Sequence, residues 1–400
     1  MSKPKIRFKG YEEDWEQRKF GNVTELKSAS RVHKEEWTTS GVPFYRSSDV
    51  MAAINGTENE KAYISEALYE KLSSISGKLE AGDVLVTGGG SVGKPYIVPN
   101  NEPLYTKDAD LLWIKNQGKF HPYFLYEFFF TPTFRSYLSS ISHVGTIAHY
   151  TITQLSETPI CLPSVGEQQK IGDYFYNIDH LITLHQRKCE ETKKLKKYML
   201  QKMFPQNGKR VPEIRFAGFT DDWEQRKLGD VLEEFSNKST VEDEYTVLSS
   251  TNTGMEFRDG RVSGRSNLGY KIIEIDDLVL SPQNLWLGNI NINNLEKGLV
   301  SPSYKTFKLR NIDKEFFRPQ LRTKKMLELY KQSSVQGASV VRRNLDMDLF
   351  EQIELNIPKI EEQAKIGEYF YNIDHLITLH QRKYEELQKI KKFMLQNMFI

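Results

Sequence analysis

A glycine-rich stretch is the first candidate for chemistry in this sequence. Residues Gly88 to Lys94 read GGGSVGK and match the opening of a phosphate-binding loop, G-x-x-x-x-G-K. The next residue is Pro95, where such a loop needs a Ser or Thr hydroxyl to hold magnesium. The residues after Pro95 favour an extended chain, so no helix N-terminus would meet a phosphate. We therefore expect no nucleotide site here.

Histidines and cysteines do not form a convincing metal site either. Four histidines occur as two repeated pairs, His180 and His185, then His375 and His380. A metal site would need carboxylate or cysteine ligands at helical spacing, and Asp179 lies next to His180 and so on another helical face. The two cysteines, Cys161 and Cys189, belong to no CxxC pair. The sequence predicts no metal and no disulfide, and it favours a reducing cytoplasm.

Polar and basic loops are the better candidates, because their side chains could contact DNA. Arg, Lys, Asn and Gln present donors that read base edges, and Ser and Thr commonly hold phosphates. In the N-terminal half we expect DNA contacts from Arg31, His33, Lys34, Arg46, Ser47, Ser91, Lys94, Thr146, His149 and Tyr150. In the C-terminal half we expect them from Arg258, Arg261, Arg265, Gln283, Asn284, Arg342, Arg343 and Asn344. For any single residue a merely solvated loop remains the alternative; DNA contact is favoured for the clusters 258–265 and 342–344.

The elements that must position these loops follow from an internal repeat. Residues 4–23, PKIRFKGYEEDWEQRKFGNV, recur as 212–231, PEIRFAGFTDDWEQRKLGDV. Residues 166–204 recur as 361–399, and Tyr174 to Lys188 matches Tyr369 to Lys383 without a change. Between these copies, the stretches 21–160 and 229–355 hardly resemble each other. The chain therefore alternates variable and constant segments.

The constant segments predict two long helices that pair with each other. Seam-compatible side chains recur in alternating steps of four and three: Ile171, Phe175, Ile178, Ile182 and His185, then Ile366, Phe370, Ile373, Ile377 and His380. After Cys189 and Thr192 we expect the seam to shift to Leu195, Met199 and Met203. The first helix ends eight residues before the second copy of the repeat begins, and the second helix ends at the last residues of the chain. Chain connectivity then favours an antiparallel pair with a pseudo-two-fold axis.

The fold class that follows is α+β, with two globular domains joined by two antiparallel coiled-coil helices. We expect a first domain at 1–162 with the repeat segment 4–20, a first helix at 163–208, a second domain at 209–357 with the repeat segment 212–228, and a second helix at 358–400. Within the variable stretches, 82–87 and 275–280 predict strands, and 121–140 and 315–332 predict helices.

Composition narrows the class of protein. Hydrophobic residues make up 38% and charged residues 27% of the 400 residues, which is typical of a globular protein. No run of eighteen apolar residues could cross a membrane, and the first residues do not resemble a signal peptide. The net charge is only +2, so a DNA-binding surface would have to concentrate its basic residues on one face.

The two-copy layout resembles the specificity subunit of Type I restriction–modification enzymes over the whole chain. The residues that carry the resemblance are Leu162-Pro163 followed by Glu167-Gln168-Gln169-Lys170-Ile171, and Ile357-Pro358 followed by Glu362-Gln363-Ala364-Lys365-Ile366. The segments Asp14 to Lys19 and Asp222 to Lys227 resemble the family's approach to each target-recognition domain. Each motif is weak alone, but their duplication in this order is specific.

The resemblance implies a protein that recognises DNA and is not itself an enzyme. Each domain would read one half of a split, asymmetric site in double-stranded DNA, and the helices would set the spacer between the halves. The partners would be two modification subunits, which methylate adenine with S-adenosylmethionine, and two restriction subunits, which use ATP and magnesium. The chain itself would bind no cofactor. The alternatives are a DNA enzyme acting alone, for which a complete cofactor motif is missing, and a coiled-coil scaffold that binds only proteins.

Overall fold

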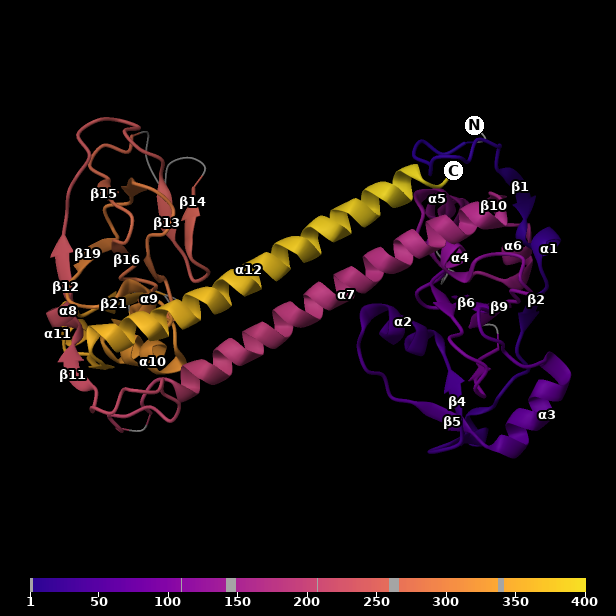
Figure 1. Cartoon of the computed structure of the whole chain (residues 1–400), viewed down its shortest axis with the longest axis horizontal. Helices are drawn as coiled ribbons and strands as arrows, with labels where there is room; N and C mark the ends of the chain where they lie inside the picture. The colour runs from indigo at the N-terminus through magenta and orange to yellow at the C-terminus, as the bar shows by residue number, and fades with distance from the viewer. Residues whose placement is uncertain (1–2, 109, 142–148, 207, 259–265, 337–341) are drawn as a thin grey trace. The chain divides into compact units, whose positions relative to one another are not determined.

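The computed structural model describes residues 3–108, 110–141, 149–206, 208–258, 266–336 and 342–400 (Figure 1). The two longest helices are α7 (Val165–Lys202) and α12 (Ile360–Asn397). Contacts divide the chain into two compact units whose boundaries fall inside these helices. Unit 1 comprises Met1–Gln186 with Arg382–Ile400, and unit 2 comprises Arg187–Gln381. Each unit thus holds one variable domain and a segment of both helices.

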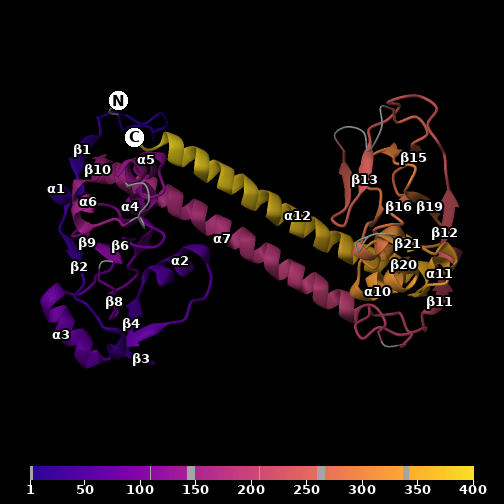
Figure 2. The ribbon, with the colours of Figure 1, turned by 180° about the vertical axis from the view of Figure 1, so that it is seen from behind.

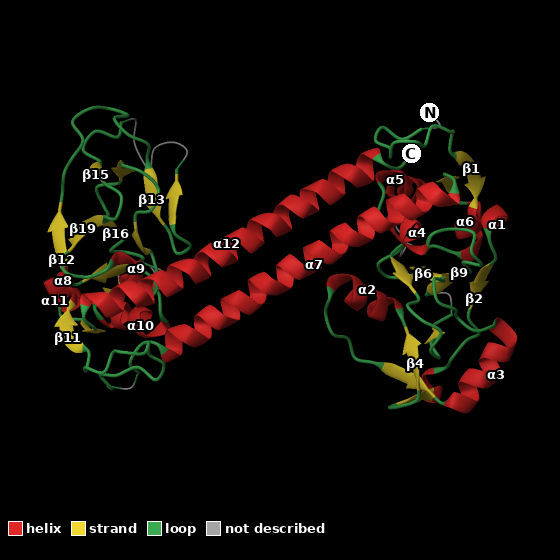
Figure 3. Ribbon diagram, in the orientation of Figure 1, coloured by secondary structure: helices red, strands yellow, loops and turns green. Residues whose placement is uncertain are grey.

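Unit 1 contains two small four-stranded sheets and several helices (Figures 2 and 3). The first sheet has the order β2 (Leu26–Ser28), β9 (Leu111–Ile114), β6 (Val84–Thr87), β7 (Pro95–Ile97), and the second the order β3 (Trp37–Thr38), β5 (Ala62–Ile64), β4 (Val42–Tyr45), β8 (Tyr105–Thr106). The helices are α1 (Phe20–Val23), α2 (Ser47–Asn55), α3 (Glu66–Ser76), α4 (Pro122–Phe128), α5 (Pro132–Ile141) and α6 (Ile152–Glu157). Val84 and Val86 pack into one core cluster and Leu85 into another, so both faces of β6 are buried.

Unit 2 is built around one four-stranded sheet and several two-stranded ribbons. The sheet has the order β12 (Leu232–Phe235), β19 (Lys305–Leu309), β16 (Leu278–Leu280), β17 (Ile290–Ile292). The ribbons are β13 (Leu248–Ser250) with β14 (Met255–Phe257), β15 (Lys271–Ile273) with β18 (Gly298–Val300), and β20 (Ser334–Gln336) with β21 (Arg343–Leu345). The helices are α8 (Leu228–Val231), α9 (Lys314–Phe317), α10 (Lys324–Gln332) and α11 (Met347–Glu351).

The expected α+β class with two long helices is confirmed, with local differences. The predicted strand 275–280 is shorter, because a turn at Asp276 precedes β16. Each of the two predicted domain helices, 121–140 and 315–332, is divided into two shorter helices. In the first, α4 ends before α5 begins at Pro132, and in the second, α9 ends before Pro319 and α10 follows. A proline inside a helix would lose a backbone hydrogen bond and clash with the preceding turn, so the chain breaks the helix there. None of the helices in the described ranges is long and apolar enough to cross a membrane.

The repeated motifs build the same junction in each unit. In unit 1, β1 (Glu16–Lys19) pairs with β10 (Pro159–Leu162) directly before α7; in unit 2, β11 (Glu224–Lys227) pairs with β22 (Glu354–Ile357) directly before α12. The Arg7 guanidinium donates two hydrogen bonds to Glu167, at 2.6 and 2.7 Å, and Arg215 donates two to Glu362, both at 2.7 Å. Both glutamates are buried, so each arginine supplies the partner that a buried carboxylate requires.

The glutamine that follows each glutamate ties the helix start to the domain. Gln168 Nε2 donates to the Pro163 carbonyl, and its Oε1 accepts from the backbone N–H of His121 at the start of α4. In unit 2, Gln363 makes the same two bonds to the Pro358 carbonyl and the Asp313 N–H. The Glu and Gln of the repeated E-Q motif therefore hold the start of each long helix to its domain.

Glycine in the first turns of each long helix permits this close packing. A Cβ on Gly172 would lie 2.0 Å from His121 Nδ1, and a Cβ on Gly367 would lie 2.8 Å from the Phe316 backbone nitrogen. Glycine within a helix costs about 1 kcal/mol relative to alanine. The close approach of α4 and α9 explains why the sequence accepts that cost.

Within each unit, the segments of α7 and α12 run antiparallel. In unit 1 the inward stripe of α7 contains Ile171, Phe175, Ile178, Ile182 and His185, and in unit 2 that of α12 contains Ile366, Phe370, Ile373, Ile377 and His380. The expected shift of the seam to Leu195 is wrong, because Leu195 is exposed and Lys196 takes the inward position. The alternating spacing of inward residues on α7 therefore continues through Lys196.

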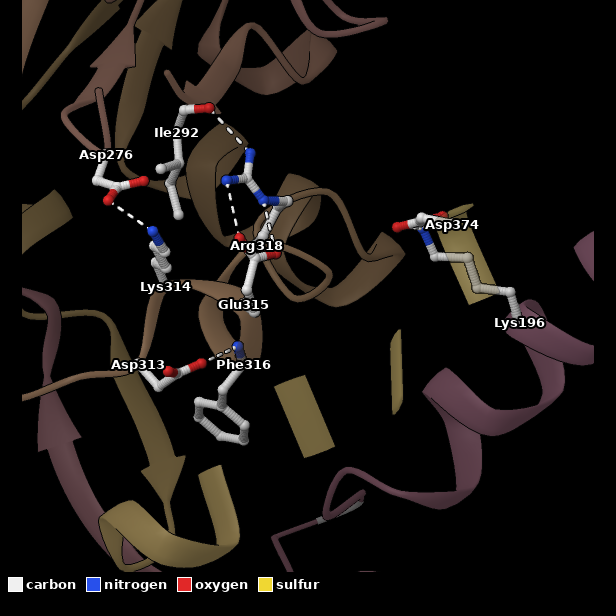
Figure 4. A network of polar contacts seen from close by, with 9 residues as sticks. All are labelled: Lys196, Asp276, Ile292, Asp313, Lys314, Glu315, Phe316, Arg318 and Asp374. Atoms are coloured by element: carbon white, nitrogen blue, oxygen red, sulfur yellow. Dashed lines mark hydrogen bonds and ion pairs between the residues drawn. The ribbon is translucent and has the colours of Figure 1, made fainter. Parts of the chain in front are cut away.

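Two equivalent ion pairs explain how a lysine fits the seam. Lys196 Nζ lies 2.6 and 2.7 Å from the two Asp374 carboxylate oxygens in unit 2 (Figure 4). Lys391 Nζ lies 2.7 Å from both Asp179 carboxylate oxygens in unit 1. A polar seam position with one matching partner favours a single register, at some cost in stability.

Aromatic residues at the ends of the long helices complete the domain cores. Phe399, after α12, stacks on Phe124 at 5.1 Å between ring centroids in unit 1. Phe204, after α7, stacks on Phe370 at 5.7 Å and lies 5.5 Å from Phe316 in unit 2. Each core therefore depends on the far end of a long helix.

Unit 1 adds a buried carboxyl to its ion pair. Glu127 of α4 is fully buried and accepts a hydrogen bond from Lys391 at 2.8 Å. In the described chain its other oxygen has no hydrogen-bond partner. Burial raises the pKa of Glu127 to about 8, and the neighbouring Asp179 adds to this effect while Lys391 opposes it.

This raised pKa predicts that unit 1 loses stability as the pH rises. The folded chain holds a proton on Glu127 that the unfolded chain has released above its ordinary pKa of 4.5, so the free energy of unfolding falls between pH 5 and about 8. The slope from one group reaches at most about 1.4 kcal/mol per pH unit. Urea midpoints at successive pH values should fall less steeply in Glu127→Gln. The exposed Glu70→Gln is the control, and equal slopes in wild type and Glu127→Gln would contradict the shift.

Candidate nucleic-acid interface

In unit 1, three of the sequence-predicted loops lie together. The Tyr150 N–H donates to the Gly88 carbonyl at 2.8 Å, which places His149 beside the glycine loop between β6 and β7. A Cβ on Gly89 would lie 3.8 Å from His149 Nδ1. The Ser47 hydroxyl and the Gly88 N–H both donate to the Asp110 carbonyl, at 3.1 and 2.7 Å. Ser47, the glycine loop with Ser91, and exposed His149 therefore form one surface.

Two cations lie at the glycine loop, one from the loop itself and one from α5. Arg135 of α5 donates to the Val92 and Gly93 carbonyls at 3.2 and 2.9 Å, and Lys94 Nζ lies 5.2 Å from the centre of the Phe130 ring. Burial lowers the pKa of Lys94, and the charge of Arg135 lowers it further. Neither cation forms an ion pair among the described residues. Both cations are half-buried beside the loop, and the Asp110 carboxylate lies 3.4 Å from the position of a Cβ on Gly89.

Two predicted contacts in unit 1 have structural roles instead. Tyr150 is buried, packs 6.0 Å from Phe134, and its hydroxyl interacts with Thr158, so the expectation that it contacts DNA is wrong in this structure. Burial also raises its pKa, so the hydroxyl stays neutral. Arg46 donates to Asp49 at 3.0 Å and stacks over Trp37 at 5.5 Å, which fixes the start of α2.

In unit 2, two predicted clusters meet in the same way. The Arg343 N–H donates to the Gln283 carbonyl at 3.1 Å, which joins β21 to the loop after β16. Gln283, Arg342 and Asn344 are exposed, and Asn284 is half-buried. The Arg343 side chain is used internally, because it donates to Ser334 Oγ at 2.8 Å and to the Ser334 carbonyl at 2.6 Å. It anchors the ribbon rather than extending into solvent.

Figure 4 shows polar contacts around α9 in the same unit. Asp313 caps α9 through the Phe316 N–H at 2.8 Å, and Lys314 pairs with Asp276 at 2.6 Å. Arg318 donates to Glu315 at 3.1 Å and to the Ile292 carbonyl at 2.9 Å. Lys314 and Arg318 are therefore engaged within the unit.

The remaining predicted residues are not brought together by described contacts. Arg31, His33 and Lys34 are exposed around a short 3-10 turn at Lys34–Glu36. Arg258 follows β14, and its side chain reaches Ser249 at 3.5 Å. Thr146, Arg261 and Arg265 lie outside the described residues.

No arrangement for metal or nucleotide chemistry accompanies these loops. In the described ranges, no three His, Cys, Asp or Glu side chains are placed to hold a metal ion. The glycine loop leads into strand β7, as the sequence suggested, and not into a helix.

Comparison with known proteins identifies a family that this chain resembles along most of its length. A family model described as the Type I restriction modification DNA specificity domain matches residues 12–194 and 220–389. The MjaX type I restriction enzyme specificity subunit of Methanocaldococcus jannaschii is 23% identical over 407 residues, covering 95% of this chain and 91% of that protein. The MjaVIII specificity subunit of the same organism is 24% identical over 67% of each chain. The crystal structure of a type I S subunit from M. genitalium matches with a TM-score of 0.63 at 15% identity, covering 100% of this chain and 99% of that one.

Proposed function

Because this chain belongs to the family of Type I restriction–modification DNA specificity subunits, we propose that it binds a bipartite, asymmetric site in double-stranded DNA. It directs adenine methylation and restriction by partner subunits and catalyses neither reaction. S-adenosylmethionine, ATP and magnesium act in those partners and not in this chain. The chain works in the cytoplasm, where its DNA target and its partners are found.

One observation carries the proposal: matching scaffolds present different side chains. Both units share the Arg–Glu junction, the Lys–Asp pair and the aromatic helix end. At the loops the units differ, with Ser91, Lys94 and His149 in unit 1 and Gln283, Arg342 and Asn344 in unit 2. Different donors select different bases, so the two units read different half-sites. The long helices hold the spacing between these half-sites.

A repeated apolar surface is the basis for proposing that two copies of one protein partner bind. Residues that directly precede a seam residue lie on one flank of an antiparallel helix pair. On that flank, unit 1 has Leu181, Leu184, Ile390 and Phe393, and unit 2 has Leu376, Leu379, Leu195 and Tyr198. All but the half-buried Leu184 are exposed. Because the two sets are copies of one another, they suit two identical modification subunits, and two restriction subunits join that complex.

Charge substitution on this flank should change the number of bound modification subunits. Leu181→Glu should remove one copy, Leu376→Glu the other, and the double variant both, because a glutamate would be buried unpaired in each interface. Native mass spectrometry of the purified complex counts the copies. Thr183→Glu and Thr378→Glu change exposed positions on the other flank and serve as controls. Two bound copies in the double variant would rule out this docking surface.

Exchange of one domain tests the reading of DNA directly. Replacing residues 21–160 by the corresponding domain of another specificity subunit should alter one half of the methylated sequence and leave the other half and the spacer intact. Methylation mapping in cells that carry the exchanged chain with its modification subunit reports both halves. A change in both halves, or in neither, would contradict independent reading by the two units.

A further inference from the structure

The ribbon of β20 and β21 presents Asn344, an expected DNA contact, together with Val335, which the sequence did not single out. Its antiparallel register places Val335 opposite Asn344 and Gln336 opposite Arg343. Side chains alternate between the two faces of a strand, so Val335 and Asn344 share one face. Directly opposite residues have Cβ atoms about 5 Å apart, so these two side chains lie side by side.

The other face of the ribbon is held against the domain. Ser334 is buried, and Leu345 packs against the main core of unit 2. Arg343 donates to Ser334 and to the Lys331 carbonyl at the end of α10, the latter at 3.3 Å. Its backbone N–H holds the Gln283 loop alongside. These bonds fix the orientation of the ribbon and leave the face of Val335 and Asn344 outward.

The outward face combines an apolar group with an amide. The Val335 side chain is 64% exposed, so it presents an apolar group to solvent. Asn344 is exposed, and no described hydrogen bond engages its amide. A two-stranded ribbon fits the major groove of B-DNA. There an asparagine amide pairs with adenine N6 and N7, and an apolar side chain contacts the thymine methyl group.

We propose that Val335 and Asn344 together read an A·T base pair, or an adjacent adenine and thymine, in the half-site of unit 2. This inference rests on the proposed function. Asn344 accepts from the adenine amino group and donates to N7, while Val335 covers the C5 methyl of thymine. Guanine offers two acceptors and no amino group there, and cytosine has an amino group and no methyl. The pair therefore discriminates against G·C, and Val335 is a specificity-determining residue.

Thymine and adenine analogues that each lack one contact test the two side chains separately. Once methylation mapping has given the wild-type site, the complex of this chain with its modification subunits is titrated with duplexes in which each half-site thymine is replaced by deoxyuridine. At one position the loss of the methyl should weaken wild-type binding about fourfold. Val335→Ala should bind the thymine duplex about that much more weakly and lose the sensitivity to deoxyuridine.

Asn344→Ala provides a second, independent measurement. Replacing the neighbouring adenine by 7-deazaadenine removes the N7 acceptor and should weaken wild-type binding but not Asn344→Ala. Val241→Ala is the matched control, because Val241 is 57% exposed in the same unit and lies outside the ribbon. That variant should keep its full sensitivity to both analogues.

The possible outcomes separate this inference from the proposed function. Loss of sensitivity in the ribbon variants alone supports the reading of A·T. Specific binding by the wild type with deoxyuridine effects that are unchanged in Val335→Ala overturns the inference and leaves the proposed function standing. A unit 2 half-site without any A·T pair also overturns it. Absence of site-specific binding by the wild-type complex overturns both.

Discussion

The burial of Phe204 and Phe399 is the constraint on which the rest of the structure depends. α7 begins in unit 1 and ends in the core of unit 2, and α12 begins in unit 2 and ends in the core of unit 1. Loss of a buried phenylalanine costs about 3–5 kcal/mol, which is a large part of the stability of a domain. Neither core is therefore complete without a helix that starts beside the other domain.

The seam between the helices gives up some apolar burial for a defined register. Leucine at the positions of Lys196 and Lys391 would bury more apolar surface, but an all-apolar seam also tolerates a shift by one heptad. A lysine shifted in this way would lose Asp374 or Asp179 and leave a partly buried ammonium group without its carboxylate. Incorrect registers are thus penalised more than the correct one is stabilised. The two equivalent pairs apply this penalty in both units.

The sequence predicted the scaffold better than the interface, for physical reasons. The repeat and its heptad spacing indicated both long helices and most of the inward stripe, because helical periodicity is a local property. The failure at Leu195 has the same origin: periodicity counts apolar residues, and only the fold supplies Asp374 to Lys196. The roles of Tyr150 and Arg343 depend on contacts with Thr158 and Ser334, which no spacing in the sequence encodes. The duplication of Arg7 and Glu167 could have indicated a shared role, although not an ion pair.

The division between scaffold and loops lets the exposed side chains of the two units differ at little cost in stability. Contacts common to the units are buried or half-buried and multiply bonded, so a single substitution there leaves an unpaired charge or a cavity. The loops that differ lie on the surface, where most substitutions change the free energy of unfolding by less than about 0.5 kcal/mol. His149 and Asn344 illustrate this, because each is exposed directly beside residues that hold its loop to the domain. Either residue can be replaced by one with other hydrogen-bonding groups without disturbing the contacts that hold its loop. Different exposed loops therefore coexist with equivalent junctions in the two units.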